Sequence, residues 1–451
     1  RAAAVRALTR AYAASARLDP AAIGELLVQG SNDADAGVRV QSLRSLSTYH
    51  EPAFARKIVP LLDDPVPAIQ VQAASTLGDL GGTAAVPDLL QIAGGTKGSF
   101  AIRREALLSL ARLDTTAFAG LVGRWSAGAD WRERAVAAEG WAIANPSAVP
   151  PFLKDTDSRV AAAALQGWGE RVNGPDPAYL TACRQLTGNR DAAVRSIAAD
   201  GIARAQSAAD VPLFLKMYEA AARDSFPDAA LSALAGLVAA TKSAPGSSQQ
   251  AERLALSQLR APENYVILRW AEENWPLAAE SWGSPYPLET GRSMDDYRNI
   301  VRRFQTGFDS ERYPTVKVDV DQLGSFEIEL FGAEAPTTVA SFMRLMDAHY
   351  FDGQRYHRVV PNFVVQAGDP RGDGWGGPGE TIRDELNLHR YGTYYVGMAL
   401  SGPDTGGSQW FITLSPQPHL DGGYTIFGRV TGGMAVLQKI TAGDRIRRIH
   451  R

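Results

Sequence analysis

Several residue classes are scarce in this 451-residue chain, and each scarcity excludes a class of protein. The chain holds one cysteine, Cys183, so it can form no disulfide within itself. The six histidines show none of the spacings that metal-ligand sets use, which argues against a structural zinc site. No stretch of about 20 apolar residues is free of charge, so we expect no membrane span.

Neither sign of charge dominates the composition. The 46 lysines and arginines face 49 aspartates and glutamates, which gives a net charge of -3. This balance provides no global attraction to nucleic acid or to an anionic membrane, so we expect neither as a partner. A content of 45% hydrophobic and 21% charged residues is typical of a folded globular protein.

The chain begins at Arg1, without a methionine and already inside a helical pattern. We therefore expect a further segment upstream, such as a signal or an anchor. One thiol is compatible with either redox compartment, and we favour an exported or periplasmic location slightly over a cytoplasmic one.

Residues 1–276 follow a helical pattern with an internal repeat. Apolar residues recur three and four positions apart, which predicts amphipathic helices. A nine-residue segment recurs with a small residue in its fifth place, at Ser42, Ala73, Ala106, Ala135, Ala162, Ala198 and Ala233, in steps of 27 to 36 residues. A second short apolar helix precedes many of these segments, for example at residues 52–62 and 211–221. Regular steps of this size predict stacked helical hairpins.

This pattern resembles the HEAT-repeat family, in particular its short bacterial form. The resemblance implies an all-α solenoid over residues 1–276 that binds a protein partner on its surface, and a non-repetitive helical bundle is the alternative. Four tryptophans, at positions 125, 131, 141 and 168, offer either partner anchors or contacts between repeats. The second interpretation is favoured, because aromatic residues at helical spacing usually lie in the core.

Residues 277–313 change in character and predict a linker with a short helix. Residues 282–287 contain glycine, serine and two prolines, which favours an extended connection. Ser293 then precedes Asp295 and Asp296, the arrangement of a helix cap followed by an acidic first turn.

Residues 314–451 switch to the period of two that is typical of β-strands. Val316, Val318 and Val320 alternate with polar residues, and residues 326–330 alternate in the same way after a turn, which predicts a β-hairpin. Pro336 opens an amphipathic helix. Short strands punctuated by glycines follow, as in a β-barrel or sandwich flanked by a helix.

Six short motifs in this part resemble the cyclophilin-type peptidyl-prolyl isomerases. They lie at residues 350–353, 356–369, 397–399, 406–412, 419–422 and 427–428. The resemblance implies an eight-stranded antiparallel β-barrel capped by two helices, which carries no cofactor and no metal. It further implies cis/trans isomerisation of X-Pro bonds in polypeptide clients, a rotation that takes tens to hundreds of seconds without a catalyst.

Arg358 matches the catalytic arginine of that family, and its chemistry suits the reaction. The prolyl nitrogen regains its lone pair only when the amide twists, so a donor aimed at this atom acts chiefly on the transition state. An arginine supplies such a donor, because its guanidinium is rigid and always charged.

The resemblance also assigns the residues around Arg358. Gln366 acts beside Arg358 in the catalytic set and orients the peptide together with the backbone near Ala399 and Leu400, and Gln409 is a supporting polar residue. Phe363, Val364, Phe411 and Leu420 form the apolar pocket for the proline ring. Val364 stands where many members carry methionine, a change that loosens one wall of the pocket but keeps it apolar. Tyr424 replaces a pocket histidine, so we expect retained activity with altered substrate preference. His419 replaces the tryptophan of the members most sensitive to cyclosporin, so we expect no strong inhibition by that cyclic peptide.

Two points stay open at this level. Trp375 lies in a loop that borders the pocket in the family, where it either selects a residue before the proline or packs on its own loop. The alternative to an isomerase is a non-catalytic adaptor whose barrel only binds proline-containing segments.

Overall fold

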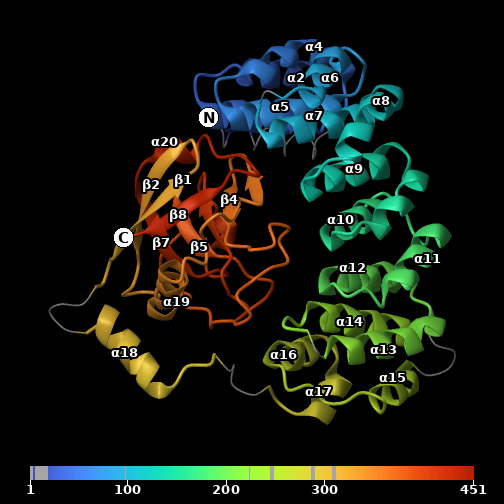
Figure 1. Cartoon of the computed structure of the whole chain (residues 1–451), viewed down its shortest axis with the longest axis vertical. Helices are drawn as coiled ribbons and strands as arrows, with labels where there is room; N and C mark the ends of the chain where they lie inside the picture. The colour runs from blue at the N-terminus through green and yellow to red at the C-terminus, as the bar shows by residue number, and fades with distance from the viewer. Residues whose placement is uncertain are drawn as a thin grey trace. The chain divides into compact units, whose positions relative to one another are not determined.

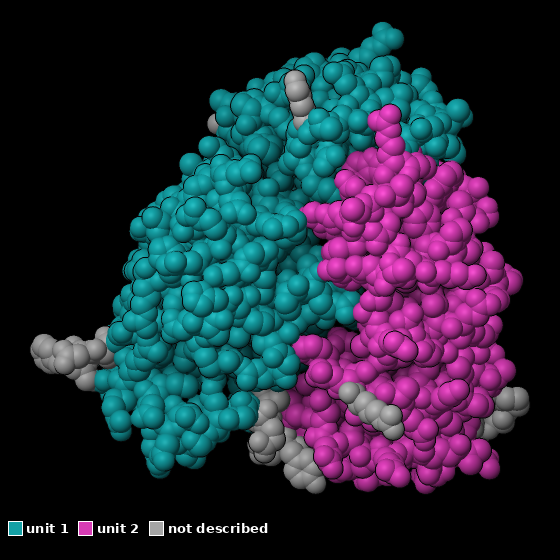
Figure 2. Space-filling model, in the orientation of Figure 1, with its two compact units in different colours: residues 1–121, 290–451 teal, residues 122–289 magenta. Residues whose placement is uncertain are grey.

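The computed structural model describes residues 4–5, 19–96, 98–222, 224–243, 248–285, 290–306 and 311–451. These fall into two compact units (Figure 2): unit 1 is Arg1–Leu121 with Thr290–Arg451, and unit 2 is Val122–Glu289. Within the described ranges, no helix combines the length and the apolar character needed to cross a bilayer.

The first part of unit 1 consists of short helices, as the repeat pattern predicts. They are α2 (Pro20–Gly30), α3 (Ala36–Leu46), η1 (Pro52–Phe54), α4 (Ala55–Ile58), η2 (Val59–Asp63), α5 (Pro67–Leu80), α6 (Val86–Gly94), α7 (Phe100–Leu113) and the start of α8 (Thr115–Ser126). The single helix expected over residues 52–62 is wrong, since three short pieces replace it. Pro60 lacks a backbone N–H and its ring clashes with the preceding turn, which interrupts a regular α-helix there.

Unit 2 continues the helical array. Its elements are α9 (Trp131–Ala144), η3 (Pro146–Ala148), η4 (Pro150–Lys154), α10 (Ser158–Gly169), α11 (Pro177–Leu186), α12 (Ala192–Ala203), η5 (Ala208–Asp210), α13 (Val211–Ala221), α14 (Asp228–Lys242), α15 (Ser248–Leu256), α16 (Tyr265–Asn274) and α17 (Pro276–Trp282). In Figure 1, α9, α10, α12 and α14 stack in one layer, with α11, α13 and α15 in a second. This is the helical-hairpin solenoid that the sequence predicts.

The small residues of the repeat lie where neighbouring helices meet, but the structure corrects their register in two repeats. Counting seven residues from each helix cap gives Ser42, Ala73, Ala106, Ala137, Ala164 and Ala198, and all six are 0% exposed. Ala135 and Ala162, the residues that the sequence alignment selects, lie two positions earlier and are 4% and 5% exposed. These two helices are rich in alanine at neighbouring positions, so the sequence does not distinguish the buried position from those beside it.

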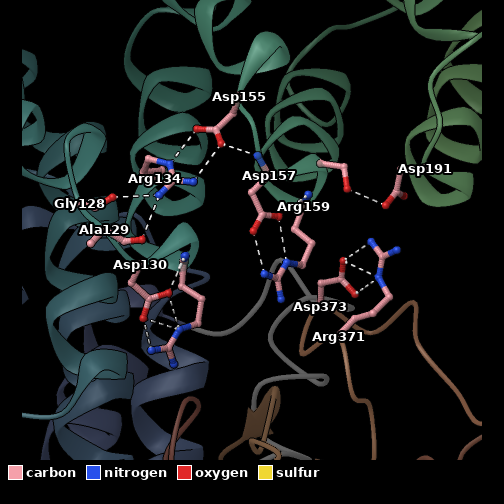
Figure 3. A network of polar contacts seen from close by, with 12 residues as sticks. Gly128, Ala129, Asp130, Arg134, Asp155, Asp157, Arg159, Asp191, Arg371 and Asp373 are labelled. Carbon is pink, nitrogen blue, oxygen red and sulfur yellow. Dashed lines mark hydrogen bonds and ion pairs between the residues drawn. The ribbon is translucent and has the colours of Figure 1, made fainter.

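A recurring arginine–aspartate contact joins successive repeats, and the sequence analysis missed it. Arg134, four residues after the cap of α9, donates from Nε and Nη2 to Asp155 at 2.8 and 2.9 Å (Figure 3). Its Nη1 donates to the carbonyl oxygens of Gly128 and Ala129, six and five residues earlier.

The same geometry recurs twice elsewhere in the array. Arg39 pairs with Asp64 and Arg195 pairs with Asp224, and each also donates to the carbonyls six and five residues before it. The hydrogen bond from Arg134 lowers the pKa of Asp155 below its usual range. Each contact therefore fixes the end of one helix against the segment that begins the next repeat.

The tryptophans of the array divide between core and surface. Trp125 and Trp168 are buried, which confirms the core interpretation for these two. Trp131 is half-buried, and the Arg159 guanidinium lies 4.1 Å from the centre of its ring. Arg159 also pairs with Asp157, the cap of α10.

The second part of unit 1 is an eight-stranded antiparallel sheet. Its strands are β1 (Thr315–Val320), β2 (Gly324–Leu330), β3 (Arg358–Val360), β4 (Val364–Ala367), β5 (Tyr395–Met398), β6 (Trp410–Thr413), β7 (Ile426–Gly432) and β8 (Ile446–His450). They lie in the order β3-β4-β6-β5-β7-β2-β1-β8. β1 and β2 form the expected hairpin, with Val318 opposite Phe326.

The two edges of this sheet are joined by the segments that precede β3 and β8. Tyr356 N donates to Asp444 O at 2.9 Å, and Ile446 N donates to Gln354 O at 2.8 Å. Gly443 N donates back to Tyr356 O at 2.9 Å. These bonds close the sheet into the barrel that the resemblance implies.

Two helices cover the barrel, α19 (Pro336–Asp347) and the four-residue α20 (Met434–Leu437). The Glu385 carboxylate caps α19 from a distant loop, accepting from Thr337 N at 2.9 Å and Thr338 N at 2.7 Å. A further helix, α18 (Met294–Phe304), begins at the expected Ser293 cap and inserts Phe304 into the barrel core.

The boundaries at residues 276 and 313 stay predictions. α17 runs across the first of them. The expected extended stretch at 282–287 lies partly outside the described residues.

We predict that Arg134→Lys destabilises the repeat array. Lysine has one nitrogen and cannot reach both carboxylate oxygens of Asp155 and two carbonyls at once, so the loss should be about 1 to 3 kcal/mol. Urea denaturation followed by circular dichroism measures it. Arg124→Lys, at an exposed arginine of α8, is the matched control and should change little; equal effects of the two variants would contradict the role of the contact.

Candidate functional site

A row of side chains crosses four neighbouring strands of the barrel. Arg358 on β3 lies opposite Gln366 on β4, Gln366 lies opposite Phe411 on β6, and Phe411 lies opposite Gly397 on β5. Side chains of directly opposite residues point to the same face of a sheet. The neighbouring row, which contains Val365 and Ile412, is fully buried in the barrel core, so the row with Arg358 faces outward.

Three polar side chains of this face form a directed chain of hydrogen bonds. Arg358 Nη1 donates to Gln366 Oε1 at 3.3 Å, and Gln366 Nε2 donates to Gln409 Oε1 at 3.0 Å. Gln409 Nε2 donates to the carbonyl oxygens of Gly374 and Gly376 at 2.8 and 2.9 Å. The two loop carbonyls thereby fix the orientation of both amides, which leaves an oxygen facing the guanidinium.

The loop that supplies these carbonyls is built around Asp369, which is 1% exposed. Its carboxylate accepts hydrogen bonds from the backbone N–H groups of Arg371, Asp373 and Gly374. Arg371 pairs with Asp373 at 2.8 Å across the turn (Figure 3). A single buried carboxylate therefore holds the backbone against which Gln409 is oriented.

An apolar cluster lies beside the polar chain. Val364 and Phe411 are 2% and 5% exposed, and Phe363, Leu420 and Tyr424 pack against them. The Phe363 ring lies under the Arg358 guanidinium at 5.5 Å and stacks on the exposed His419 with ring centres 5.8 Å apart. Tyr424 meets Phe411 edge-on at 5.9 Å. The cluster thus presents apolar and aromatic surface next to one fixed cation.

Tyr391 packs against this cluster, and the sequence analysis did not predict its role. Its ring stacks on Phe411 with centres 5.5 Å apart, and burial raises its pKa, so it remains a neutral hydroxyl. Gly397 makes this packing feasible, because a Cβ there would lie 2.2 Å from the Tyr391 hydroxyl and 2.5 Å from the Phe411 ring. The glycine that begins the 397–399 motif therefore indicates a position where the packing leaves no room for a side chain.

His357 precedes the exposed Arg358 in the chain; its side chain is half-buried, and both of its ring nitrogens are shielded from solvent. Neither ring nitrogen has a hydrogen-bond partner among the described residues. Burial lowers its pKa, and the nearby carboxylates of Asp369 and Asp373 oppose this effect. The imidazole is therefore held neutral behind the polar chain.

The structure brings the expected site residues together from distant parts of the chain. Ala399 packs on the apolar cluster and its N–H donates to Gln409 O at 3.0 Å, whereas Leu400 packs against the main barrel core. Trp375 lies in the loop fixed by Asp369, with its N–H bonded to Asp373 and its ring half-buried. Across the described residues, no group of three or more metal-ligating side chains gathers. The site thus places hydrogen-bond donors beside an apolar surface.

Comparisons with known protein families agree with these two architectures. Residues 315–450 match the model of the cyclophilin type peptidyl-prolyl cis-trans isomerases. Residues 55–142 match the model of HEAT repeats.

Individual relatives align with the barrel. A peptidyl-prolyl cis-trans isomerase-like 1 of Aspergillus niger is 50% identical over 123 residues, which are 26% of this chain and 76% of the relative. Peptidyl-prolyl cis-trans isomerase B of Bacillus subtilis is 46% identical over 125 residues, 27% of this chain and 87% of the relative. A crystal structure of a Cryptosporidium parvum cyclophilin type isomerase in the presence of the dipeptide ala-pro is 30% identical and covers 30% of this chain and 97% of its own, with a TM-score of 0.29.

We predict that His357 makes the barrel sensitive to acid. Its pKa in the folded chain lies below the unfolded value of about 6.5, so the unfolded chain takes up the proton first as the pH falls. Stability should therefore decline below about pH 6.5, by at most about 1.4 kcal/mol per pH unit from this group. His357→Gln should remove this part of the slope in thermal unfolding measured from pH 7 to 5. Parallel curves for the two proteins would show that His357 is not the responsible group.

Proposed function

Because the chain belongs to the cyclophilin-type peptidyl-prolyl cis-trans isomerase family, we propose that Arg358 catalyses rotation of X-Pro bonds in polypeptide clients that the helical array holds nearby. Isomerase activity follows from the family. The role of each site residue and the task of the array are the proposal. The cross-strand row of Arg358, Gln366 and Phe411 is the observation that carries it.

The reaction breaks no covalent bond, so the site must lower a rotational barrier. That barrier, about 18–20 kcal/mol, comes from amide resonance and disappears as the nitrogen becomes pyramidal. The outward-facing Arg358 guanidinium can donate to the nitrogen lone pair only in this twisted state. Gln366 holds the guanidinium by its Oε1, so little reorganisation is needed when the peptide twists.

The apolar cluster supplies the matching surface for the proline ring. Phe363, Val364, Phe411 and Leu420 would bind the ring, with His419 and Tyr424 at the border. Burial of the ring fixes one side of the X-Pro bond while the other side rotates. Ala399, whose N–H is already bonded to Gln409 O, would leave its carbonyl oxygen for the peptide backbone.

We propose that the array binds unfolded or extended polypeptide segments. A solenoid of stacked hairpins presents an extended surface of the kind used for protein binding. The half-buried Trp131 with Arg159 on its ring is one aromatic anchor of the type enriched at such interfaces.

The alternative of a non-catalytic adaptor makes a different demand on the same site. An adaptor needs the apolar cluster but gains nothing from a guanidinium oriented by two amides and two backbone carbonyls. The hydrogen-bond chain therefore favours catalysis over simple binding.

We predict that Arg358→Ala lowers kcat/KM for a four-residue X-Pro peptide about 10²- to 10³-fold, the usual cost of removing one transition-state donor. Binding of the peptide should change much less, because the apolar cluster remains. Exchange NMR on the full chain measures both quantities. Arg383→Ala, at an exposed arginine outside the cluster, is the control. Equal catalysis by wild type and Arg358→Ala would overturn the assignment, and wild type that binds without catalysed exchange would establish the adaptor.

We further predict that an unfolded, proline-free polypeptide competes only for the array. It should slow isomerisation of an unfolded protein client by the full chain, because that client also uses the array. It should leave isomerisation of a four-residue peptide unchanged, because the peptide needs only the barrel. If both substrates or neither were affected, the array would have no separate client-binding role.

A further inference from the structure

We infer that helix α3 of the repeat array positions the β3–β4 turn of the isomerase site. This inference rests on the proposed function of that site. The repeats around α3 and the barrel lie in the same compact unit (Figure 2). Arg44, near the end of α3, donates from Nη1 to the carbonyl oxygen of Pro361 at 3.2 Å.

The β3–β4 turn connects the two main parts of the site. It consists of Pro361, Asn362 and Phe363, and it joins Arg358 on β3 to Gln366 on β4. β3 is only three residues long and forms an edge of the sheet, so β4 is its single strand neighbour. A hairpin this short depends on contacts at its turn to hold Arg358 in place.

The turn is held from the barrel side by the segment after β6. Ser415 Oγ and Gln417 Nε2 donate to the Asn362 carbonyl oxygen at 2.7 and 3.2 Å. Asn362 itself has φ +58°, the left-handed conformation that few residues other than asparagine and glycine adopt readily. Its side-chain Nδ2 is buried and has no hydrogen-bond partner within the described residues. Leu414 N also donates to Phe363 O at 2.8 Å. This side therefore holds the carbonyls of Asn362 and Phe363 but leaves the Asn362 amide nitrogen unsatisfied.

Helix α3 meets the other side of the turn with a face built for close approach. Gly37 and Arg44 lie two helical turns apart on one side of the helix. A Cβ at Gly37 would lie 3.8 Å from Asn362 Oδ1, in van der Waals contact with the turn, and 3.1 Å from Oδ1 of Asp35, the cap of α3. Pro361 is buried although it lies at the tip of a hairpin.

The consequence is that a repeat supports Arg358 and Phe363 through the turn between them. Arg44 acts as a positioning residue, since its hydrogen bond to Pro361 O acts on the turn that connects β3 with β4. Loss of its hydrogen bond should let the turn move and loosen the geometry of the site.

The test uses two variants of the full chain, Arg44→Ala and Gly37→Gln. The first removes the hydrogen bond, and the second adds bulk against the turn at a position where glutamine also favours the helix. We expect faster hydrogen–deuterium exchange in residues 358–366 and a kcat/KM about two- to tenfold lower for a four-residue X-Pro peptide. Arg56→Ala, at an exposed arginine of α4, should change neither.

The outcomes separate this inference from the proposed function. Unchanged exchange at 358–366 in both variants would overturn the contact, and faster exchange with unchanged kcat/KM would overturn its positioning role. Exchange does not depend on catalysis. A wild-type chain without isomerase activity would therefore refute the proposed function while the exchange result still decided the contact.

Discussion

The register of three short antiparallel strands determines the site. β3, β4 and β6 contain three, four and four residues, and their pairing sets Arg358, Gln366 and Phe411 in one outward row. A slip of one residue would turn this row into the barrel and bring Val365 and Ile412 to the surface, which the core cannot accept. The buried rows therefore impose the position of the guanidinium, and the hydrogen bonds among the amides refine it.

Local patterns in the sequence predicted several individual elements of the fold. Alternation at Val316–Val320 and Phe326–Leu330 predicted the first hairpin, and Pro336 and Ser293 marked two helix starts, all of which the structure confirms. Each of these signals acts over a few residues. The closing bonds between residues 353–356 and 443–446 join segments with no such signal, and the barrel was expected from the resemblance alone.

The interactions that the sequence did not predict join residues that are far apart in the chain but close together in the folded structure. Arg134 and Asp155 are 21 residues apart in the sequence, and only the stacking of the helices brings their side chains into contact. In the same way, Gln409 was expected as a supporting residue, but its partners Gly374 and Gly376 have no side chains that could signal a role. In two alanine-rich helices, the register of the repeat could not be read from the sequence. Several neighbouring positions hold small residues, and only their burial in the structure distinguishes them.

The closure of the barrel has a consequence for the order in which the chain folds. Asp319 in β1 contacts Arg447 and His450 in β8, 128 and 131 residues later, so the barrel requires both ends of its sequence at once. Contacts between successive repeats span far fewer residues and can form as each hairpin leaves the ribosome. Structures dominated by such local contacts fold faster than those with long-range strand pairing. The array therefore folds first during synthesis. The isomerase barrel folds only after its last strand has been made, when the helices of the array have already formed.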